Sequence, residues 1–292
     1  MVIQRKSGFT LVELLVTIAI VGILMTIAIP AIQAVRESAN RVACANNIRQ
    51  IALAANNYQS SHGQYPSGIH SSASSTRRNS TWLATLLPFV EQDNLYNESQ
   101  DWFQAGVSAY FHTVAHQPVP TYECPSDPRS GRSHFSHGFH VALTSYMGVC
   151  GTDYQSMDGI FYSDSLVRPS EITDGLSNTL MIGERPASSD EWFGWWYAGF
   201  GQAGSGSPDM LLGVRERNDG ASNTEGCPLG LYGFKPGDIN DQCSTFHYWS
   251  LHGGGAQFAF ADGSVKMISY EIGDVFVALG TRAGGEVVSN EY

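Results

Sequence analysis

A long apolar segment near the N-terminus limits what this chain can fold into more than any other feature. The residues from Phe9 to Ile32 include a single charged side chain, Glu13. As a helix this segment would extend roughly 36 Å, which exceeds the hydrocarbon core of a bilayer at about 30 Å. Helices of soluble proteins are seldom apolar on every face over such a length, because one face normally meets water. The sequence therefore predicts a membrane-spanning helix.

Two further features accompany the apolar segment. A polar leader, residues 1–8, carries Arg5 and Lys6. A secretory signal peptide would have a shorter apolar core of about 7–15 residues and a small-residue cleavage site, and the residues that follow this segment make a weak site. Glu13 is an ionisable group at membrane depth, which is costly and therefore points to a function. A single membrane anchor is expected to offer this carboxylate no partner.

Residues 6–15, KSGFTLVELL, resemble the cleavage and methylation motif of type IV prepilins and of the pseudopilins of type II secretion. The resemblance implies that a prepilin peptidase and methyltransferase cuts between Gly8 and Phe9 and N-methylates Phe9. It also places Glu13 at the position of the family's glutamate. The implied partners are other pilin-like subunits. The implied location is a single pass through the inner membrane, with the N-terminus cytoplasmic before cleavage and the head periplasmic or extracellular.

An assembly role for Glu13 follows from electrostatics. Cleavage would create a positive N-terminus at Phe9, about one helical turn from Glu13. When stems stack, the ammonium group of one subunit could pair with Glu13 of its neighbour. In a low-dielectric environment this attraction is far stronger than in water.

The helix is expected to continue past the membrane as an amphipathic stem that ends near Tyr58. Polar residues occupy its other faces, while apolar residues recur at roughly helical spacing. These apolar positions are Ile32, Val35, Val42, Ile48, Ile51, Leu53, Ala55 and Tyr58. Such a pattern fits a helix that leaves lipid and docks one stripe on a globular domain. Pro30 is expected to kink or open the helix locally.

The rest of the chain is predicted to be a globular head. Residues 67–80 are expected to form a Ser-rich loop, 81–90 a short helix in two parts, and 94–115 a helical or irregular stretch. Long surface loops are expected at 203–208 and 217–237. The candidate strands are Thr121–Cys124, Ser145–Gly148, Gly159–Phe161, Asn178–Gly183, Trp192–Gly199, Ala256–Ala261 and Val265–Tyr270.

The predicted fold class is α+β, with a long N-terminal transmembrane helix packed on an antiparallel β-sheet head, as in pilins. The predicted domains are a leader (1–8), a transmembrane and stem helix (9–60) and an extracytoplasmic head (61–292).

Asp262-Gly263, between two alternating runs, is the strongest local signal for a hairpin. A two-residue type I′ turn would give both residues a positive φ and would pair Phe260 with Val265 and Phe258 with Met267. These four apolar residues would then share one face, and Lys266 would lie on the other.

His252 and Asp262-Gly263, with nine residues between them, match the H-x9-DG signature of a family of prepilin-like bacterial proteins that carry a domain of unknown function numbered 1559. This resemblance implies a pilin-like architecture and leaves the biochemical role undefined. Other segments that fit the family are 124–127 (CPSD), 145–148 (SYMG), 158–161 (DGIF), 172–179 (ITDGLSNT) and 183–184 (GE).

Charge and motifs narrow the class of function. The chain has 16 Lys and Arg against 27 Asp and Glu, a formal charge of −11, so it is poorly suited to neutralise a phosphate backbone and no nucleic-acid partner is expected. His252 and Asp262 could form a catalytic pair, but no nucleophile motif such as GxSxG accompanies them. We therefore expect a protein that is not an enzyme and that uses no cofactor.

Histidines and turn aspartates are the two kinds of candidate metal ligand in the sequence. His134, His137 and His140 are three apart and His112 and His116 four apart, spacings that could converge on a metal from a helix. Glycines near His134, His137 and His140 argue against a helix there, so a solvated loop is expected. Turn aspartates could supply oxygen ligands to calcium, but their spacing is not that of an EF-hand. They are Asp127, Asp153, Asp158, Asp174 and Asp262. No metal site is assigned.

The five cysteines suit an oxidising compartment. Cys227 and Cys243 bracket a loop and are a candidate disulfide; Cys124 and Cys150 are the other plausible pair, which would leave Cys44 free. Free buried thiols are the alternative for each pair.

Trp192, Trp195 and Trp196 could form a carbohydrate-binding platform, although strand alternation favours a core position for part of this cluster. The predicted function is a structural subunit or minor component of a type IV pilus or of a type II secretion-like pseudopilus. The alternative is a membrane-anchored extracytoplasmic protein that uses the prepilin signal for export and binds carbohydrate or another ligand with its head.

Overall fold

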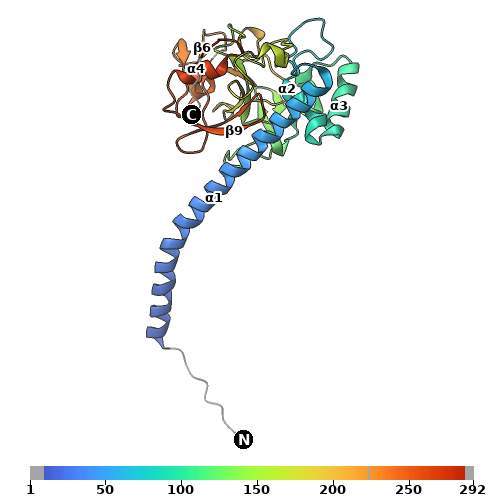
Figure 1. Ribbon diagram of the computed structural model, residues 1–292. Coiled ribbons are helices and arrows are strands. Elements are labelled where there is room, and N and C mark those ends of the chain that lie inside the picture. Colours follow the sequence, from blue (N-terminus) through green and yellow to red (C-terminus); the bar gives the residue numbers. More distant parts are fainter. Residues whose placement is uncertain (1–9, 223, 287–292) are drawn as a thin grey trace. The chain divides into compact units, whose positions relative to one another are not determined.

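The computed structural model describes residues 10–222 and 224–286. The chain divides into two compact units, residues 1–42 and 43–292. Helix α1 (Leu11–His62) belongs to both, and it is continuous through Pro30, so the expected opening at this proline does not interrupt it (Figure 1).

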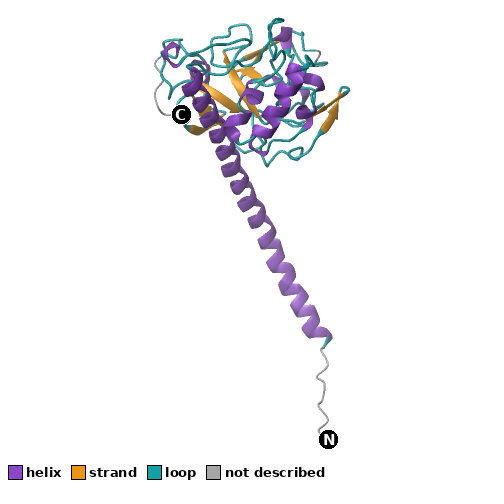
Figure 2. Ribbon diagram, turned by 90° about the vertical axis from the view of Figure 1, so that its right-hand side faces the viewer, coloured by secondary structure: helices purple, strands orange, loops and turns teal. Residues whose placement is uncertain are grey.

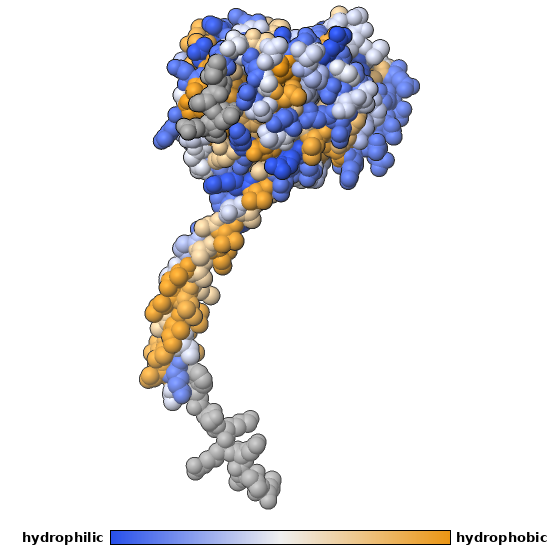
Figure 3. Space-filling model, viewed as in Figure 1, coloured by the Kyte–Doolittle hydropathy of each residue, from blue (hydrophilic) through white to orange (hydrophobic). Residues whose placement is uncertain are grey.

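The first unit consists, from Thr10 to Val42, of the N-terminal part of α1. Its apolar side chains point outward on all sides, and Leu11, Ile18, Leu24 and Ile32 are each more than half exposed. Figure 3 shows these apolar residues covering the visible side of this segment. Helix α1 is long and apolar enough to cross a membrane, because it contains a stretch of 18 residues with a mean hydropathy of 2.6, none of them buried.

The second unit is built around a five-stranded sheet (Figure 2). In spatial order its strands are β5 (Leu211–Gly213), β3 (Tyr146–Gly151), β4 (Leu180–Glu184), β8 (Gly255–Phe260) and β9 (Val265–Ser269). Neighbouring strands are antiparallel except β3 and β5, which run parallel. The α+β class is confirmed, and one edge of the sheet departs from the antiparallel prediction.

Short elements surround this sheet. Two strand pairs lie outside it, β1 (His134–Ser136) with β2 (Phe139–Val141) and β6 (Glu216–Asn218) with β7 (Gly230–Tyr232). The α-helices are α2 (Trp82–Thr85), α3 (Asp93–Gln104) and α4 (Val275–Gly280). The 3₁₀ turns are η1 (Leu87–Val90), η2 (Ala109–Phe111), η3 (Thr113–His116), η4 (Pro120–Tyr122), η5 (Pro169–Glu171), η6 (Gln202–Gly204) and η7 (Gln242–Phe246).

The two faces of the sheet are buried by different elements. Residues 43–62 of α1, here called the stem, pack with Tyr146, Ile182 and Ala259 on one face. On the other face Phe258 and Phe260 pack with side chains of α4. The buried residues of the stem are Cys44, Ile48, Ile51, Ala52, Ala54 and Ala55. Its alanines let the helix backbone come close to the sheet.

The predicted docking stripe of the stem is right in part. Ile48, Ile51 and Ala55 are buried, but Leu53 is 51% exposed and Val42 is 58% exposed. The face that meets the sheet is centred on small residues, which the apolar pattern alone did not indicate.

Three of the predicted strands are wrong. Segment 121–124 begins inside η4, which Pro120 starts, and segments 159–161 and 192–199 are irregular. The aromatic residues of the last segment are nevertheless buried, and isolated bridges join Leu143 to Trp195 and Ser80 to Ala198. Aromatic residues are common in buried irregular segments as well as in strands, so the aromatic residues of 192–199 were mistaken for a strand. The loop expected at 217–237 contains the β6–β7 pair.

The β8–β9 hairpin exists, but its predicted register is off by one residue. Phe258 lies opposite Lys266 and Ala259 opposite Val265. Gly263 N–H donates to Phe260 O at 2.9 Å, and Gly263 has φ +86°, whereas Asp262 is not among the described residues with positive φ. These features define a three-residue loop with a bulge at Gly263 rather than a type I′ turn. Lys266 therefore shares a face with Phe260, and its Nζ lies 5.2 Å from the centre of that ring.

Candidate functional sites

The N-terminal end of α1 carries a reciprocal cap. The backbone N–H and the hydroxyl of Thr10 both donate to Oε2 of Glu13 at 2.8 Å, and the N–H of Glu13 reaches the Thr10 hydroxyl at 3.3 Å. This arrangement is a capping box, which satisfies N–H groups that a helix leaves open. The expectation that Glu13 has no partner within one chain is therefore wrong. Gly8 and Phe9, the predicted cleavage site, lie outside the described residues.

The first half of the H-x9-DG signature lies against a disulfide. Cys44 of the stem is bonded to Cys124, and Nε2 of His252 lies 3.5 Å from Sγ of Cys124 and 3.7 Å from Oε1 of Glu184. Glu184 is held in turn by the N–H of Gln257, which donates to its Oε2 at 2.7 Å. All of these side chains are buried. His252 therefore joins the disulfide to the centre of the sheet.

The second half of the signature lies against the same helix. Gly263 faces the stem so closely that a Cβ atom placed there would lie 3.3 Å from Nδ2 of Asn56. The hydroxyl of Tyr65 lies between the two segments, 3.1 Å from Oδ1 of Asn56 and 3.2 Å from the carbonyl oxygen of Ala261, and its single proton can be donated to either acceptor.

His252 and Gly263 thus lie against the stem at two different positions along the helix axis. Cys44 and Asn56 are separated by about 18 Å of helix. Strand β8, which lies between His252 and Asp262, has a length of about 20 Å. A strand of this length lets one motif hold the stem at two points. The same separation rules out His252 and Asp262 as a directly contacting catalytic pair.

The cysteine pairing corrects one prediction. The structure pairs Cys44 with Cys124 and leaves Cys150 as a buried free thiol, so the Cys124–Cys150 pair and the free Cys44 were wrong. Cys227 and Cys243 are joined by a second disulfide. Burial raises the pKa of the Cys150 thiol well above its usual range, which makes it unreactive.

Among the described residues, the candidate histidines do not belong to any group of three or more donor atoms close enough to hold a metal, although the ring centres of His116 and His140 lie 6.2 Å apart. Both ring nitrogens of His112 are engaged, by Tyr197 and by the carbonyl of Val107. Those of His134 are engaged by Glu191 and by the carbonyl of Arg129.

The turn aspartates are also engaged within the chain. Asp127 binds the Arg129 side chain, Asp158 binds Thr152, and Asp174 accepts from the N–H groups of Gly284 and Gly285. Asp153 and Asp262 accept from backbone N–H groups two or three residues further along the chain.

Within the described part of the chain one cluster has donor atoms close enough to hold a metal: Cys44, Cys124, Glu184 and His252. Its two sulfurs are bonded to each other. Because thiolates are the form that binds metal, the cluster in this state offers a metal only the histidine nitrogen and the carboxylate.

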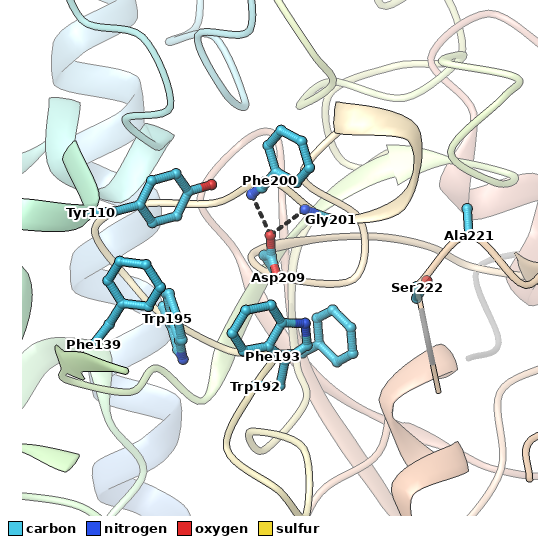
Figure 4. Close-up of a pocket in the computed structure, with 10 residues that line it drawn as sticks. All are labelled: Tyr110, Phe139, Trp192, Phe193, Trp195, Phe200, Gly201, Asp209, Ala221 and Ser222. Carbon is cyan, nitrogen blue, oxygen red and sulfur yellow. Dashed lines mark hydrogen bonds between the residues drawn. The ribbon is translucent and has the colours of Figure 1, made fainter. Parts of the chain in front are cut away.

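A pocket of about 320 Å³ opens on another part of the head (Figure 4). Its lining is Tyr110, Phe139, Trp192, Phe193, Trp195, Phe200, Gly201, Asp209, Ala221 and Ser222. The rings of Trp192 and Trp195 lie nearly perpendicular, with centres 5.3 Å apart, and Phe139 packs against Trp195. Trp196, by contrast, is buried in the core. Only part of the tryptophan cluster is therefore core, and the rest forms pocket wall.

Asp209 is the charged group of this pocket. Its Oδ2 accepts from the N–H groups of Phe200 and Gly201 at 2.5 and 2.6 Å (Figure 4). Burial raises the pKa of Asp209 to about 7, although these N–H groups and the Arg185 guanidinium partly offset the effect. Asp209 and Ser222 were missed in the sequence because they come from irregular segments without a motif.

Comparison with known families agrees with this architecture. A sequence profile described as "Prokaryotic N-terminal methylation motif" matches residues 3–29, directly over the apolar helix. The chain is therefore an exported, membrane-anchored protein of the type IV pilin-like class, and the motif implies processing by a prepilin peptidase.

A second profile, described as "Protein of unknown function (DUF1559)", matches residues 33–274. The chain belongs to this DUF1559 family, as the H-x9-DG signature indicated. No curated protein and no solved structure matches the chain.

Proposed function

We propose that this protein is a structural subunit, or a minor component, of a type IV pilus or of a type II secretion-like pseudopilus. The observation that carries the proposal is the combination of the N-terminal methylation motif with an apolar helix exposed on every side. Such a helix needs either lipid or other helices around it. A stack of identical helices supplies the second environment outside the membrane.

The proposed maturation follows the order of the segments. The leader, residues 1–8, is removed between Gly8 and Phe9, Phe9 is N-methylated, and the helix stays in the inner membrane with the head on the periplasmic or extracellular side. Prepilin peptidase, other pilin-like subunits and the membrane are the partners; nucleic acid is not among them. The protein acts by assembly and not as an enzyme.

Glu13 gives this assembly its direction. Within a single chain its carboxylate accepts hydrogen bonds from the backbone N–H and the hydroxyl of Thr10. After cleavage the ammonium group of Phe9 stands one residue before Thr10, where the positive end of the helix dipole adds to its charge. In a stack of helices the ammonium of an incoming subunit competes with Thr10 for the Glu13 carboxylate of its neighbour. The pair fixes the axial position of the two subunits.

Two substitutions at Glu13 separate capping from charge. Glu13→Ala removes both, whereas Glu13→Gln keeps a side chain that can complete the capping box and removes only the charge. Each variant is expressed in cells, sheared filaments are collected, and the amount of this protein in them is compared with the amount cleaved in the membrane.

We expect both variants to be inserted and cleaved as efficiently as the unchanged protein and both to be lost from filaments. Recovery of Glu13→Gln in filaments would show that the charge is not needed and would contradict the ion-pair mechanism. Equal recovery of all three proteins in filaments would mean that Glu13 plays no part in assembly, and absence of the unchanged protein from filaments would favour a membrane anchor that does not assemble.

A further inference from the structure

The aromatic pocket of the head contains two polar groups that the protein itself does not satisfy. Asp209 is 7% exposed and uses Oδ2 for two backbone N–H groups, but within the described residues its Oδ1 has no hydrogen-bond partner. Ser222 is 6% exposed, and its hydroxyl is buried with no partner in the described part of the chain. Buried polar atoms are nearly always hydrogen-bonded, and leaving one unpaired is costly.

The other walls of the pocket are rigid aromatic rings. The indole N–H of Trp195 donates to the carbonyl of Glu191 at 2.7 Å, which fixes the ring. Trp192 stands at 79° to it, and Phe200, 61% exposed, lies at the rim. The pocket thus presents apolar ring faces together with two hydrogen-bonding groups.

We propose that this pocket binds a saccharide through a single neutral pyranose ring. A pyranose has a C–H face that packs on aromatic rings and hydroxyl groups that can donate to Asp209 and pair with Ser222. The cavity volume, about 320 Å³, is at the lower end of the range of roughly 300–1,000 Å³ found for small-molecule sites, which suits one ring.

Two other ligand classes fit less well. A purely apolar ligand would leave the buried Ser222 hydroxyl unpaired. A cation would meet aromatic faces but little net negative charge, because burial raises the pKa of Asp209 to about 7 and its Oδ2 already accepts from two backbone N–H groups. Among the described residues that line the pocket, Asp209 is the single carboxylate.

The test is a ligand-observed NMR titration of the purified full chain. The protein is kept in a polyoxyethylene detergent, since a detergent with a sugar head group would compete for the pocket. The probes are methyl glycosides of glucose, galactose, mannose and N-acetylglucosamine, with choline as the cationic probe. We expect saturable binding of at least one glycoside with a dissociation constant near 1 mM, an order-of-magnitude value.

Variants locate the binding. Trp192→Ala removes a ring face and Ser222→Ala removes one hydroxyl with almost no change in shape; each should weaken binding by about tenfold or more. Phe135→Ala is the control, because Phe135 is an exposed aromatic residue of the head, at 67%, that does not line the pocket. Circular dichroism establishes that each variant is folded.

Three results would overturn the proposal: saturable binding of none of the glycosides, tighter binding of choline than of any glycoside, or unchanged glycoside affinity in Ser222→Ala. The NMR titration uses no filaments. A negative titration would therefore overturn the saccharide site without bearing on the proposed assembly function, and a negative filament experiment would not bear on the saccharide site.

Discussion

Nε2 of His252 lies 3.5 Å from Sγ of Cys124, the sulfur that is bonded to Cys44 of the stem. The histidine of the H-x9-DG signature is thus placed where the long helix is covalently attached to the head. The glycine of the same signature faces Asn56, three turns further along the helix. These contacts give the signature a structural explanation: it holds the stem against the sheet, and it needs no catalytic role.

Replacing Gly263 by valine should destabilise the head by about 1–3 kcal/mol. Gly263 has φ +86°, which a β-branched residue adopts only under strain, and a new side chain would press on Asn56. Urea unfolding of the full chain in detergent measures the effect. Gly253→Val is the control, because Gly253 has ordinary backbone geometry and open space around it. Equal stability of the two variants would show that the turn and its stem contact do not matter.

The two disulfides should contribute unequally. Cys44–Cys124 spans 80 residues of sequence and Cys227–Cys243 spans 16. On the loop-entropy argument the first is worth about 4–5 kcal/mol and the second about 3 kcal/mol. The Cys44→Ser/Cys124→Ser double variant should therefore unfold at a lower urea concentration than the Cys227→Ser/Cys243→Ser double variant. The reverse order would mean that the stem is held mainly by packing.

Part of the pH dependence of stability should come from Asp209. Burial raises its pKa from the ordinary value of 3.8 to about 7, so between these values the folded protein holds a proton that the unfolded chain has released. This contribution to stability is complete below about pH 4 and is lost as the pH rises to about 7. In Asp209→Asn this decline should disappear.

The measurement is the thermal midpoint of the full chain across this pH range. The difference between Asp209→Asn and the unchanged protein should move in favour of the variant as the pH rises. Asp101→Asn, on an exposed position of α3, is the control and should show a constant difference. His247 acts in the opposite sense, because burial lowers its pKa to about 4 and its contribution is lost as the pH falls below about 6.5. A constant difference for Asp209→Asn would mean that Asp209 is not buried as a proton-binding group.

Processing can be read directly from the mature N-terminus. Mass spectrometry of the native protein should find a chain that starts with N-methylated Phe9, and Gly8→Val should block cleavage because the peptidase needs a residue without a side chain there. Ser7→Ala, next to the cut, should be processed normally. An intact Met1 terminus, or a cut after residue 30, would refute the processing site.

Local patterns in the sequence predicted the local structure well. The apolar run and its amphipathic continuation predicted α1, and Asp262-Gly263 predicted the β8–β9 hairpin. The register of that hairpin was wrong because the same dipeptide suits both a two-residue turn and a three-residue loop with a bulge. Neighbouring residues do not distinguish these; the contact of Gly263 with the stem is part of the tertiary structure.

Features that depend on distant contacts were harder to predict. The partner of Cys124 is 80 residues away on the stem, so the pairing depends on how the helix docks and not on spacing. The aromatic pocket draws Tyr110 from η2, Phe139 from β2, and Trp192, Asp209 and Ser222 from three irregular segments far apart in the sequence. The tryptophan run was compatible with an aromatic platform, although a core position was favoured for part of it, and nothing in the sequence marked Asp209 or Ser222 as polar partners of these rings.

The Cys44–Cys124 bond also determines how the molecule bears mechanical load. A pull applied to the N-terminal end of α1 reaches Cys44 through the helix and crosses to Cys124 through a covalent bond. When the head is held at any point after Cys124, the intervening chain, with α2 and α3, lies outside the path of the force. Tension therefore cannot separate residues 45–62 of the stem from the sheet unless the sulfur–sulfur bond breaks. The stem and the sheet stay together under loads that would separate surfaces held by packing alone.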